Sequence, residues 1–340
     1  MTKKFSPRVG PAFPILTIAV PTYNRAQRLQ QCLIGLEEQL AELADRNLSV
    51  EVLVVDNAST DETFDVCNIF KEKIPSLKYI RNEKNLGIDG NIYRCSQLSN
   101  GTWVQLLSDD DILLPGAISY IISQILYYPE ADFLFLNPIS FADDLPPRDT
   151  WEPRVPVREN TICMDPNDLV SSCGIWLTFL SSFVFRRNSW NASGRGSTYI
   201  GTDIYLSFAL FDMLAIGNPS VILARPLVAA RAHYSGSYRI FYAFGRQWPE
   251  LLLSHAPKLG FNYKKMRSVL DKTIITDLLP RILAYRLNDA ELQPEDRRNI
   301  FYGAKVGHYS TVLIWLSATI PHFYLNKIRA VFKFLKKIAT

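Results

Sequence analysis

The chain has 340 residues, of which 48% are hydrophobic and 21% charged, a globular composition that argues against wholesale disorder. Its net charge is +4, but residues 297–340 hold eight Lys and Arg and no Asp or Glu, so that segment carries +8 and residues 1–296 carry −4. A chain-wide nucleic-acid surface is therefore not predicted. Five scattered cysteines without a C-x-x-C pair argue against a disulfide framework, and the proline-interrupted start predicts a cytosolic protein without a signal peptide.

The first third of the chain alternates predicted strands and helices. Continuous apolar runs indicate strands, and apolar residues spaced three or four apart indicate helices. The alternation predicts an α/β fold with a mostly parallel sheet and helices on both faces. In chain order we expect a strand at 15–20, a helix at 26–44, a strand at 50–55, a helix at 63–71, a strand at 77–80, a loop at 82–90, a short helix to 99, a strand from 103, a helix from Pro115 to about 127 and a strand at 131–136.

Three consecutive aspartates, Asp109 to Asp111, follow the strand that begins at Trp103. Carboxylates this close repel one another, and hard cations such as Mg²⁺ and Mn²⁺ bind such oxygens together with substrate phosphates. Neither a dinucleotide-binding glycine motif nor a P-loop is present. The cluster therefore predicts a metal-bridged phosphate ligand. The alternative is that these acids only cap the helix expected near Pro115.

Four polar motifs lie at or near the ends of the predicted strands, where α/β sheets bind ligands. They read Pro21-Thr22-Tyr23-Asn24-Arg25, Val54-Val55-Asp56-Asn57-Ala58-Ser59-Thr60-Asp61, Asn85-Leu86-Gly87 and Leu107-Ser108-Asp109-Asp110-Asp111-Ile112-Leu113. In order and spacing they resemble the family-2 glycosyltransferases of Rossmann-like GT-A fold, over roughly residues 14–235. The resemblance implies a nucleotide-sugar donor, Mn²⁺ or Mg²⁺, and transfer with inversion at the sugar.

The resemblance also assigns donor-binding residues. Asp56 would bind the nucleobase, and Asp109 and Asp110 would form the D-x-D pair. We assign Asp110 to the metal, Asp109 to the ribose or metal, and Asp111 to their support. Ser108 stands where the family often has aspartate, and a hydroxyl can bond to ribose without matching the charge of a carboxylate. The predicted donor-binding set is Pro21, Thr22, Tyr23, Arg25, Asp56, Asn85, Gly87, Ser108 and Asp109.

Inversion needs a general base that takes the proton of the acceptor hydroxyl. The resemblance assigns this role to Asp203, which follows a glycine and is expected to open a helix; the alternative is an ordinary aspartate of a first helical turn. His233 is predicted as a second metal ligand, and the alternative is a packed or surface histidine. Trp176 and Ser181 are predicted to contact the acceptor, from a segment, 175–187, that resembles the strand beneath the acceptor site. Aromatic faces suit sugar rings, although most of that segment also fits a core strand.

The predicted domains are a catalytic domain at 1–240, with a donor half at about 14–137 and an acceptor half at about 138–240, and a helical region at 241–340. Within the acceptor half, residues 140–160 are expected to form a mobile loop that could close over the donor. The helical region ends at 323–340 in a predicted amphipathic helix with apolar residues on one face and Lys and Arg beside and opposite it. Such a helix can lie on an anionic membrane; the alternative is that it docks on the domain.

Together these features predict a metal-dependent glycosyltransferase at the cytoplasmic face of the plasma (inner) membrane. It would add a sugar to a saccharide or lipid-linked oligosaccharide of a cell-surface polysaccharide such as an O-antigen. One alternative is a nucleotide-sugar-binding protein without catalysis. A second is a sugar nucleotidylyltransferase, which the absence of a glycine- and lysine-rich phosphate loop disfavours.

Overall fold

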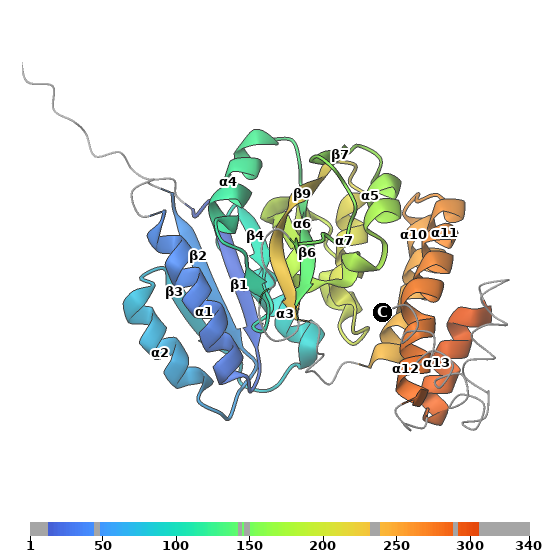
Figure 1. The fold of residues 1–340 in the computed structure, drawn as a ribbon, viewed down its shortest axis with the longest axis horizontal. Helices are drawn as coiled ribbons and strands as arrows, with labels where there is room; N and C mark the ends of the chain where they lie inside the picture. Colours follow the sequence, from blue (N-terminus) through green and yellow to red (C-terminus); the bar gives the residue numbers. More distant parts are fainter. Residues whose placement is uncertain are drawn as a thin grey trace, which may run out of the picture.

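The computed structural model describes residues 13–43, 48–141, 145, 150–231, 239–287 and 292–305. A nine-stranded mixed sheet lies at the centre of these residues, with helices on both faces (Figure 1). Its strands are β1 (Leu16–Thr22), β2 (Val50–Asp56), β3 (Leu77–Arg81), β4 (Trp103–Leu106), β5 (Ile112–Leu113), β6 (Phe133–Phe141), β7 (Thr161–Cys163), β8 (Phe183–Arg186) and β9 (Ser220–Arg231).

The strand order is β3-β2-β1-β4-β8-β6-β9-β5, with β7 paired to β9. Strands β3, β2, β1, β4, β6 and β9 run in one direction, and β8, β5 and β7 run against them. In the parallel register Thr22 pairs with Asp56, and Asp56 pairs with Arg81. The carboxyl ends of these strands therefore form one continuous edge, where ligands bind in such sheets.

Among the described residues up to 231, the α-helices that accompany the strands are α1 (Ala26–Ala41), α2 (Thr63–Lys73), α3 (Gly87–Leu98), α4 (Ala117–Tyr127), α5 (Pro166–Cys173), α6 (Arg187–Ala192) and α7 (Tyr205–Leu214). Successive side chains of a strand point to opposite faces, so a strand between two helix layers is apolar throughout. In β2, Val52 and Val54 join the core formed with α1, α2 and α4. Leu53 and Val55 join the core formed with α3, α5 and α7.

Further helices follow after residue 239 and lie beside α5 and α7 (Figure 1). They are α8 (Ile240–Tyr242), α9 (Trp248–Glu250), α10 (Ala256–Lys258), α11 (Tyr263–Thr273), α12 (Leu279–Leu287) and α13 (Pro294–Lys305), with π-helical turns at Ala243–Gln247, Leu251–His255 and Ile274–Leu278. Phe211 of α7 stacks on Phe261 at 5.0 Å between ring centroids and meets the edge of Trp248 at 6.5 Å. The core on this side of the sheet thus continues across residue 240.

The predicted fold class is confirmed, the C-terminal region is helical over its described residues up to Lys305, and several boundaries are corrected. Helix α4 begins at Ala117, because Gly116 is left-handed (φ 73°), so Pro115 precedes the helix instead of starting it. Helix α3 begins inside the predicted loop, at Gly87. Most of 175–187 forms short 3₁₀ turns ahead of β8, and α7 begins at Tyr205, two residues after Asp203.

No helix within the described ranges is both long and apolar enough to span a bilayer. The predicted basic helix at 323–340 lies outside the described residues. Of the predicted loop at 140–160, the start belongs to β6, and residues 142–144 and 146–149 are not described.

Candidate active site

Asp109 lies at the centre of a polar cluster beyond the end of β4. Its carboxylate accepts hydrogen bonds from Thr22 Oγ1 at 2.7 Å and from Arg25 Nη1 at 2.9 Å. Thr22 ends β1 and Arg25 directly precedes α1, so the parallel pairing of β1 with β4 brings both residues to Asp109. Burial raises the pKa of Asp109 to about 6, against the opposing effect of the Arg25 guanidinium.

Arg25 also binds the next carboxylate, through a 3.2 Å contact between Nη1 and Asp110 Oδ2. Asp110 Oδ1 accepts a hydrogen bond from Ser108 Oγ at 2.7 Å. The Asp110 side chain remains 16% exposed, whereas that of Asp109 is almost fully covered. Asp110 is therefore the member of this pair that reaches solvent, and Ser108 orients it.

Asp111 points away from this pair into the protein. It accepts hydrogen bonds from Ser181 Oγ at 2.6 Å and from the backbone N–H of Arg231 at 3.1 Å. Burial, followed by repulsion from Asp110, raises its pKa to about 7. Asp111 ties the acidic loop to the end of β9, and α4 has no side-chain cap. The alternative that Asp109 to Asp111 only cap the helix near Pro115 is therefore not supported.

Ser181 was predicted to contact the acceptor, but its side chain is fully buried. Besides donating to Asp111, its hydroxyl accepts a hydrogen bond from the backbone N–H of Ser108 at 2.9 Å. In this conformation Ser181 holds both ends of the acidic loop. We assign it that supporting role in place of acceptor contact.

The acidic loop offers oxygen ligands, the type that Mg²⁺ and Mn²⁺ prefer. Within the described part of the chain, no three His, Cys, Asp or Glu side chains are grouped to hold an ion without help. Mg²⁺ is often held by one or two carboxylates together with substrate phosphates. Asp110, with Asp109 beside it, fits such a shared site if Arg25 releases its carboxylate. His233, the other predicted ligand, lies outside the described residues.

Asp56 lies one strand away and is only 1% exposed. Its Oδ1 accepts from the backbone N–H of Ser59 at 2.9 Å, and its Oδ2 accepts from the Tyr79 hydroxyl at 2.6 Å, with Arg81 Nε at 3.6 Å. Burial, followed by this hydrogen bond, raises the pKa of Tyr79. The predicted contact between Asp56 and a nucleobase stays a prediction, and it requires the covering side chains to move.

Tyr23 is exposed and Pro21 half-buried, at the end of β1. Trp176 is half-buried too, with its ring edge-on to Phe179 at 5.9 Å and the Arg154 guanidinium 5.7 Å from its ring centroid. The side chains of Pro21, Tyr23 and Trp176 are therefore at least partly accessible to a ligand. Their assignments to donor and acceptor remain predictions.

An asparagine network, which sequence reasoning missed, connects β2 with the start of α3. Asn57 Nδ2 donates to Asn85 Oδ1 at 2.8 Å and to the carbonyl of Gly87 at 3.2 Å. Asn82 donates to Asn57 and to Asn91, at 3.1 and 2.9 Å. The predicted donor residues Asn85 and Gly87 thus shape the N-terminus of α3. The sequence signal was the density of asparagine in two adjacent loops.

Asp203 adopts a left-handed backbone conformation (φ 61°), which is uncommon for a residue other than glycine. Its carboxylate forms a bidentate ion pair with Arg239, from Nε at 2.9 Å and from Nη2 at 3.0 Å. The Asp203 side chain is 11% exposed and the Arg239 side chain 52%. The backbone N–H of Asp203 donates to the carboxylate of Asp89 in α3 at 2.8 Å. Asp89 was not among the residues predicted from the sequence.

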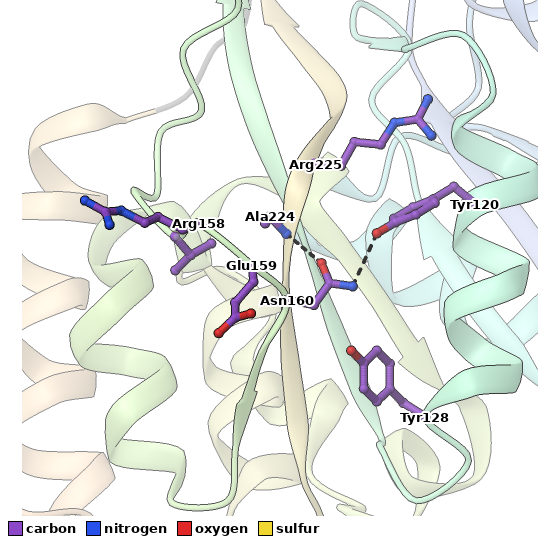
Figure 2. A pocket seen from close by; sticks show the side chains of 8 residues that line it. Tyr120, Tyr128, Arg158, Glu159, Asn160, Ala224 and Arg225 are labelled. Carbon is purple, nitrogen blue, oxygen red and sulfur yellow. Dashed lines mark hydrogen bonds between the residues drawn. The ribbon is translucent and has the colours of Figure 1, made fainter.

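A separate hollow of about 590 Å³ lies between α4 and β9 (Figure 2). Asn160 bridges its walls, donating to the Tyr120 hydroxyl at 3.2 Å and accepting from the backbone N–H of Ala224 at 3.0 Å. Its lining residues are Tyr120, Tyr128, Val157, Arg158, Glu159, Asn160, Ala224 and Arg225. No predicted site residue is among them.

Comparisons with known proteins agree with this arrangement. Residues 17–185, about half of the chain, match the model of glycosyl transferase family 2. Abequosyltransferase RfbV of Salmonella typhimurium is 27% identical over 64% of this chain and 66% of its own length. The Campylobacter jejuni GalNAc(5)-diNAcBac-PP-undecaprenol beta-1,3-glucosyltransferase is 30% identical over 33% of this chain and 34% of its own. Both alignments span less than two thirds of the relative.

Among solved structures, S. aureus TarS 1-349 in complex with UDP superposes with a TM-score of 0.62. The superposition covers 93% of this chain and 91% of TarS 1-349, at 14% sequence identity, which is evidence for the fold alone. The family match at residues 17–185 runs from β1 to β8, so it includes the motifs at the carboxyl edge of the parallel strands. The chain belongs to glycosyl transferase family 2.

Proposed function

We propose that the chain is an inverting, metal-dependent glycosyltransferase. It would move a sugar from a nucleotide-sugar donor to a hydroxyl of a saccharide or lipid-linked saccharide in cell-surface polysaccharide biosynthesis. The observation that carries this proposal is the Thr22–Asp109–Arg25–Asp110 cluster at the carboxyl edge of the parallel strands. Kinship with an abequosyltransferase and with an undecaprenol-linked glucosyltransferase supports the acceptor class.

In this proposal the donor half binds the nucleoside diphosphate. Asp110 would hold Mg²⁺ or Mn²⁺, Asp109 would support it, and Ser108 would keep Asp110 oriented. The bound ion would offset the charge that develops on the departing diphosphate. Arg25 would turn from the carboxylates toward the phosphates, because its guanidinium is a strong partner for either anion.

Asp203 would accept the proton of the acceptor hydroxyl while that oxygen attacks the sugar. A single displacement from the face opposite the nucleotide inverts the configuration at the sugar carbon. Asp203 can do this only after it exchanges the bidentate contact with Arg239 for the acceptor hydroxyl. Acceptor binding would therefore include release of that ion pair.

We further propose peripheral association with the cytoplasmic face of the plasma (inner) membrane. The support is the sequence of residues 323–340, which combines an apolar face with basic residues and no acid. A lipid-linked acceptor would be reached from that surface.

A transfer assay tests the proposed function. Uridine, cytidine, guanosine and thymidine diphosphate sugars are each incubated with the protein and a panel of saccharide and lipid-linked acceptors, and release of the nucleoside diphosphate is measured. Transfer that requires Mg²⁺ or Mn²⁺ and stops in EDTA is the expected result. Transfer of equal rate in EDTA would contradict the role given to Asp110.

One alternative is a protein that binds nucleotide sugars without turnover. The Asp203–Arg239 ion pair supports it, because a carboxylate held by an arginine is not available as a base. Calorimetric binding of a nucleotide sugar without release of the nucleoside diphosphate, with every acceptor in the panel, would favour that alternative.

A further inference from the structure

We propose that Asp89 is a positioning residue for catalysis: its buried carboxylate sets the backbone of the 201–205 loop and thereby aims the side chain of Asp203. The inference rests on the proposed function, in which Asp203 is the general base. Asp89 belongs to the donor half and lies outside the motifs that predict the donor site. It would act through Asp203 and would not touch the reacting atoms.

Three backbone N–H groups of the loop converge on the Asp89 carboxylate. The N–H groups of Gly201 and Asp203 both donate to Oδ2 at 2.8 Å, and that of Tyr205 lies 3.4 Å from Oδ1. Asp89 is only 4% exposed, so these contacts are shielded from water. Successive N–H groups that point into one concavity form an anion-binding site. Here the anion is a side chain of the protein itself.

The loop has a conformation that needs such a partner. Gly201 (φ 100°) and Asp203 (φ 61°) both lie in the left-handed region, which is uncommon for residues other than glycine. Left-handed residues persist where surrounding contacts over-determine them, and such sites are often functional. The Asp89 carboxylate binds the N–H groups of these same two residues, and so holds the part of the backbone that directs the Asp203 side chain.

Asp89 is itself fixed relative to the donor-binding edge. It is the third residue of α3, whose start is held by Asn57. Two residues further along the helix, Asn91 donates to the carbonyl of Val55 at 3.0 Å and lies 3.4 Å from that of Thr22. Thr22 is the residue whose hydroxyl binds Asp109. Helix α3 thus connects the acidic cluster with the Asp203 loop through a few hydrogen bonds.

Substituting Asp89 with asparagine or with alanine separates the charge of its carboxylate from its role as a hydrogen-bond acceptor. In Asp89→Asn the side-chain oxygen can still accept the two 2.8 Å hydrogen bonds from Gly201 and Asp203. Only the longer contact with the N–H of Tyr205 is lost, because the amide NH₂ group that replaces Oδ1 is itself a donor. In Asp89→Ala all three N–H groups lose their acceptor. Asp65→Ala is the matched control, because Asp65 is also the third residue of its helix, α2, and is exposed.

The experiment measures kcat and KM for the nucleotide sugar that the transfer assay identifies, in single variants and in the Asp203→Asn background. We expect Asp89→Ala to lower kcat about 100-fold with little change in KM for the donor, as a misplaced catalytic group does. Asp89→Asn should retain most of the activity, and Asp65→Ala all of it. Amide hydrogen exchange at Gly201, Asp203 and Tyr205 should accelerate in Asp89→Ala.

The double variant decides between positioning and general support of the fold. If Asp89 acts through Asp203, adding Asp89→Ala to Asp203→Asn causes no further loss of kcat. A further loss of similar size, or an Asp89→Ala variant with normal kcat, would overturn the inference while leaving the proposed function intact. A wild-type protein that transfers no sugar from any donor would overturn the proposed function, and the inference with it.

Discussion

Arg239 holds both carboxylate oxygens of Asp203, donating from Nε at 2.9 Å and from Nη2 at 3.0 Å. The same guanidinium donates to the carbonyl of Gly201 at 3.2 Å and lies 4.1 Å from the ring centroid of Tyr242. The pair joins the 201–205 loop to α8, the first helix after residue 239. The state described here is therefore one in which the proposed base is held away from any acceptor.

The first prediction concerns Asp203 itself. Asparagine has the same shape and tolerates the left-handed backbone, so Asp203→Asn should fold normally and bind nucleoside diphosphate in calorimetry as the wild type does. It cannot accept the acceptor proton, and turnover should fall by about 10²–10⁴-fold. Asp168→Asn, which alters an exposed aspartate paired with Lys265, is the control and should be fully active. Undiminished turnover in Asp203→Asn would reject it as the base.

The second prediction concerns Arg25, which bridges Asp109 and Asp110. Replacing it with alanine leaves two adjacent carboxylates without this cation, so Arg25→Ala in EDTA should lose on the order of 1–3 kcal/mol of stability. Mg²⁺ or Mn²⁺ should then raise the melting temperature of the variant more than that of the wild type. Arg28→Ala, in the first turn of α1, should show neither effect. Equal metal responses in all three proteins would mean that the ion does not bind where Arg25 lies.

The third prediction concerns the pH dependence that Asp111 imposes on stability. Its pKa is raised to about 7 in the folded protein, against about 3.9 in an unfolded chain. The folded state therefore binds more protons between these values, and the contribution of Asp111 to stability falls as pH rises from about 4 to about 7. Asp111→Asn lacks this dependence.

Chemical denaturation in EDTA measures this difference. The stability of Asp111→Asn relative to wild type should increase from pH 4 to pH 7 by on the order of 1–4 kcal/mol and then level off. The Asp168→Asn variant, altered at an exposed site, serves as the reference for general pH effects. A constant difference across this range would contradict the raised pKa.

The fourth prediction concerns residues 323–340. Deleting Phe323–Thr340 should weaken sedimentation of the protein with anionic vesicles and leave its melting temperature unchanged, because the segment would contact lipid instead of the domain. Changing Lys333, Lys336 and Lys337 to Gln should weaken binding to anionic vesicles alone. If the deletion instead lowers the melting temperature and leaves vesicle binding as it was, the segment docks on the protein.

Much of the fold could be predicted because β1 and β2 are buried on both faces, which produces uninterrupted apolar runs. Strand β5 could not, since it has only two residues and its pairing with Val228 and Ala229 of β9 is a contact between segments far apart in sequence. The start of α4 was misplaced because the proline signal at Pro115 is overridden by the left-handed Gly116 that follows it.

Part of the candidate site could likewise be predicted from the sequence, and part could not. The acidic cluster was predictable, since Asp109 and Asp110 are adjacent in sequence and follow a strand. The contact between Asp89 and the N–H of Asp203 spans 114 residues and involves backbone atoms, which leave no pattern of side chains to detect. The burial of Ser181 is likewise a tertiary property, because a serine reads the same in a buried turn as in an open one.

The continuation of the apolar core across residue 240 limits how the protein can be divided. Phe211 and Met213 of α7 lie in the same core as Trp248, Leu251 and the residues beyond. A fragment that ends at residue 240 would expose the side chains of Phe211 and Met213 to water, and would be expected to aggregate. We therefore expect the smallest autonomous folding unit to be longer than the segment that carries the family motifs, because the helices after residue 239 complete its apolar core.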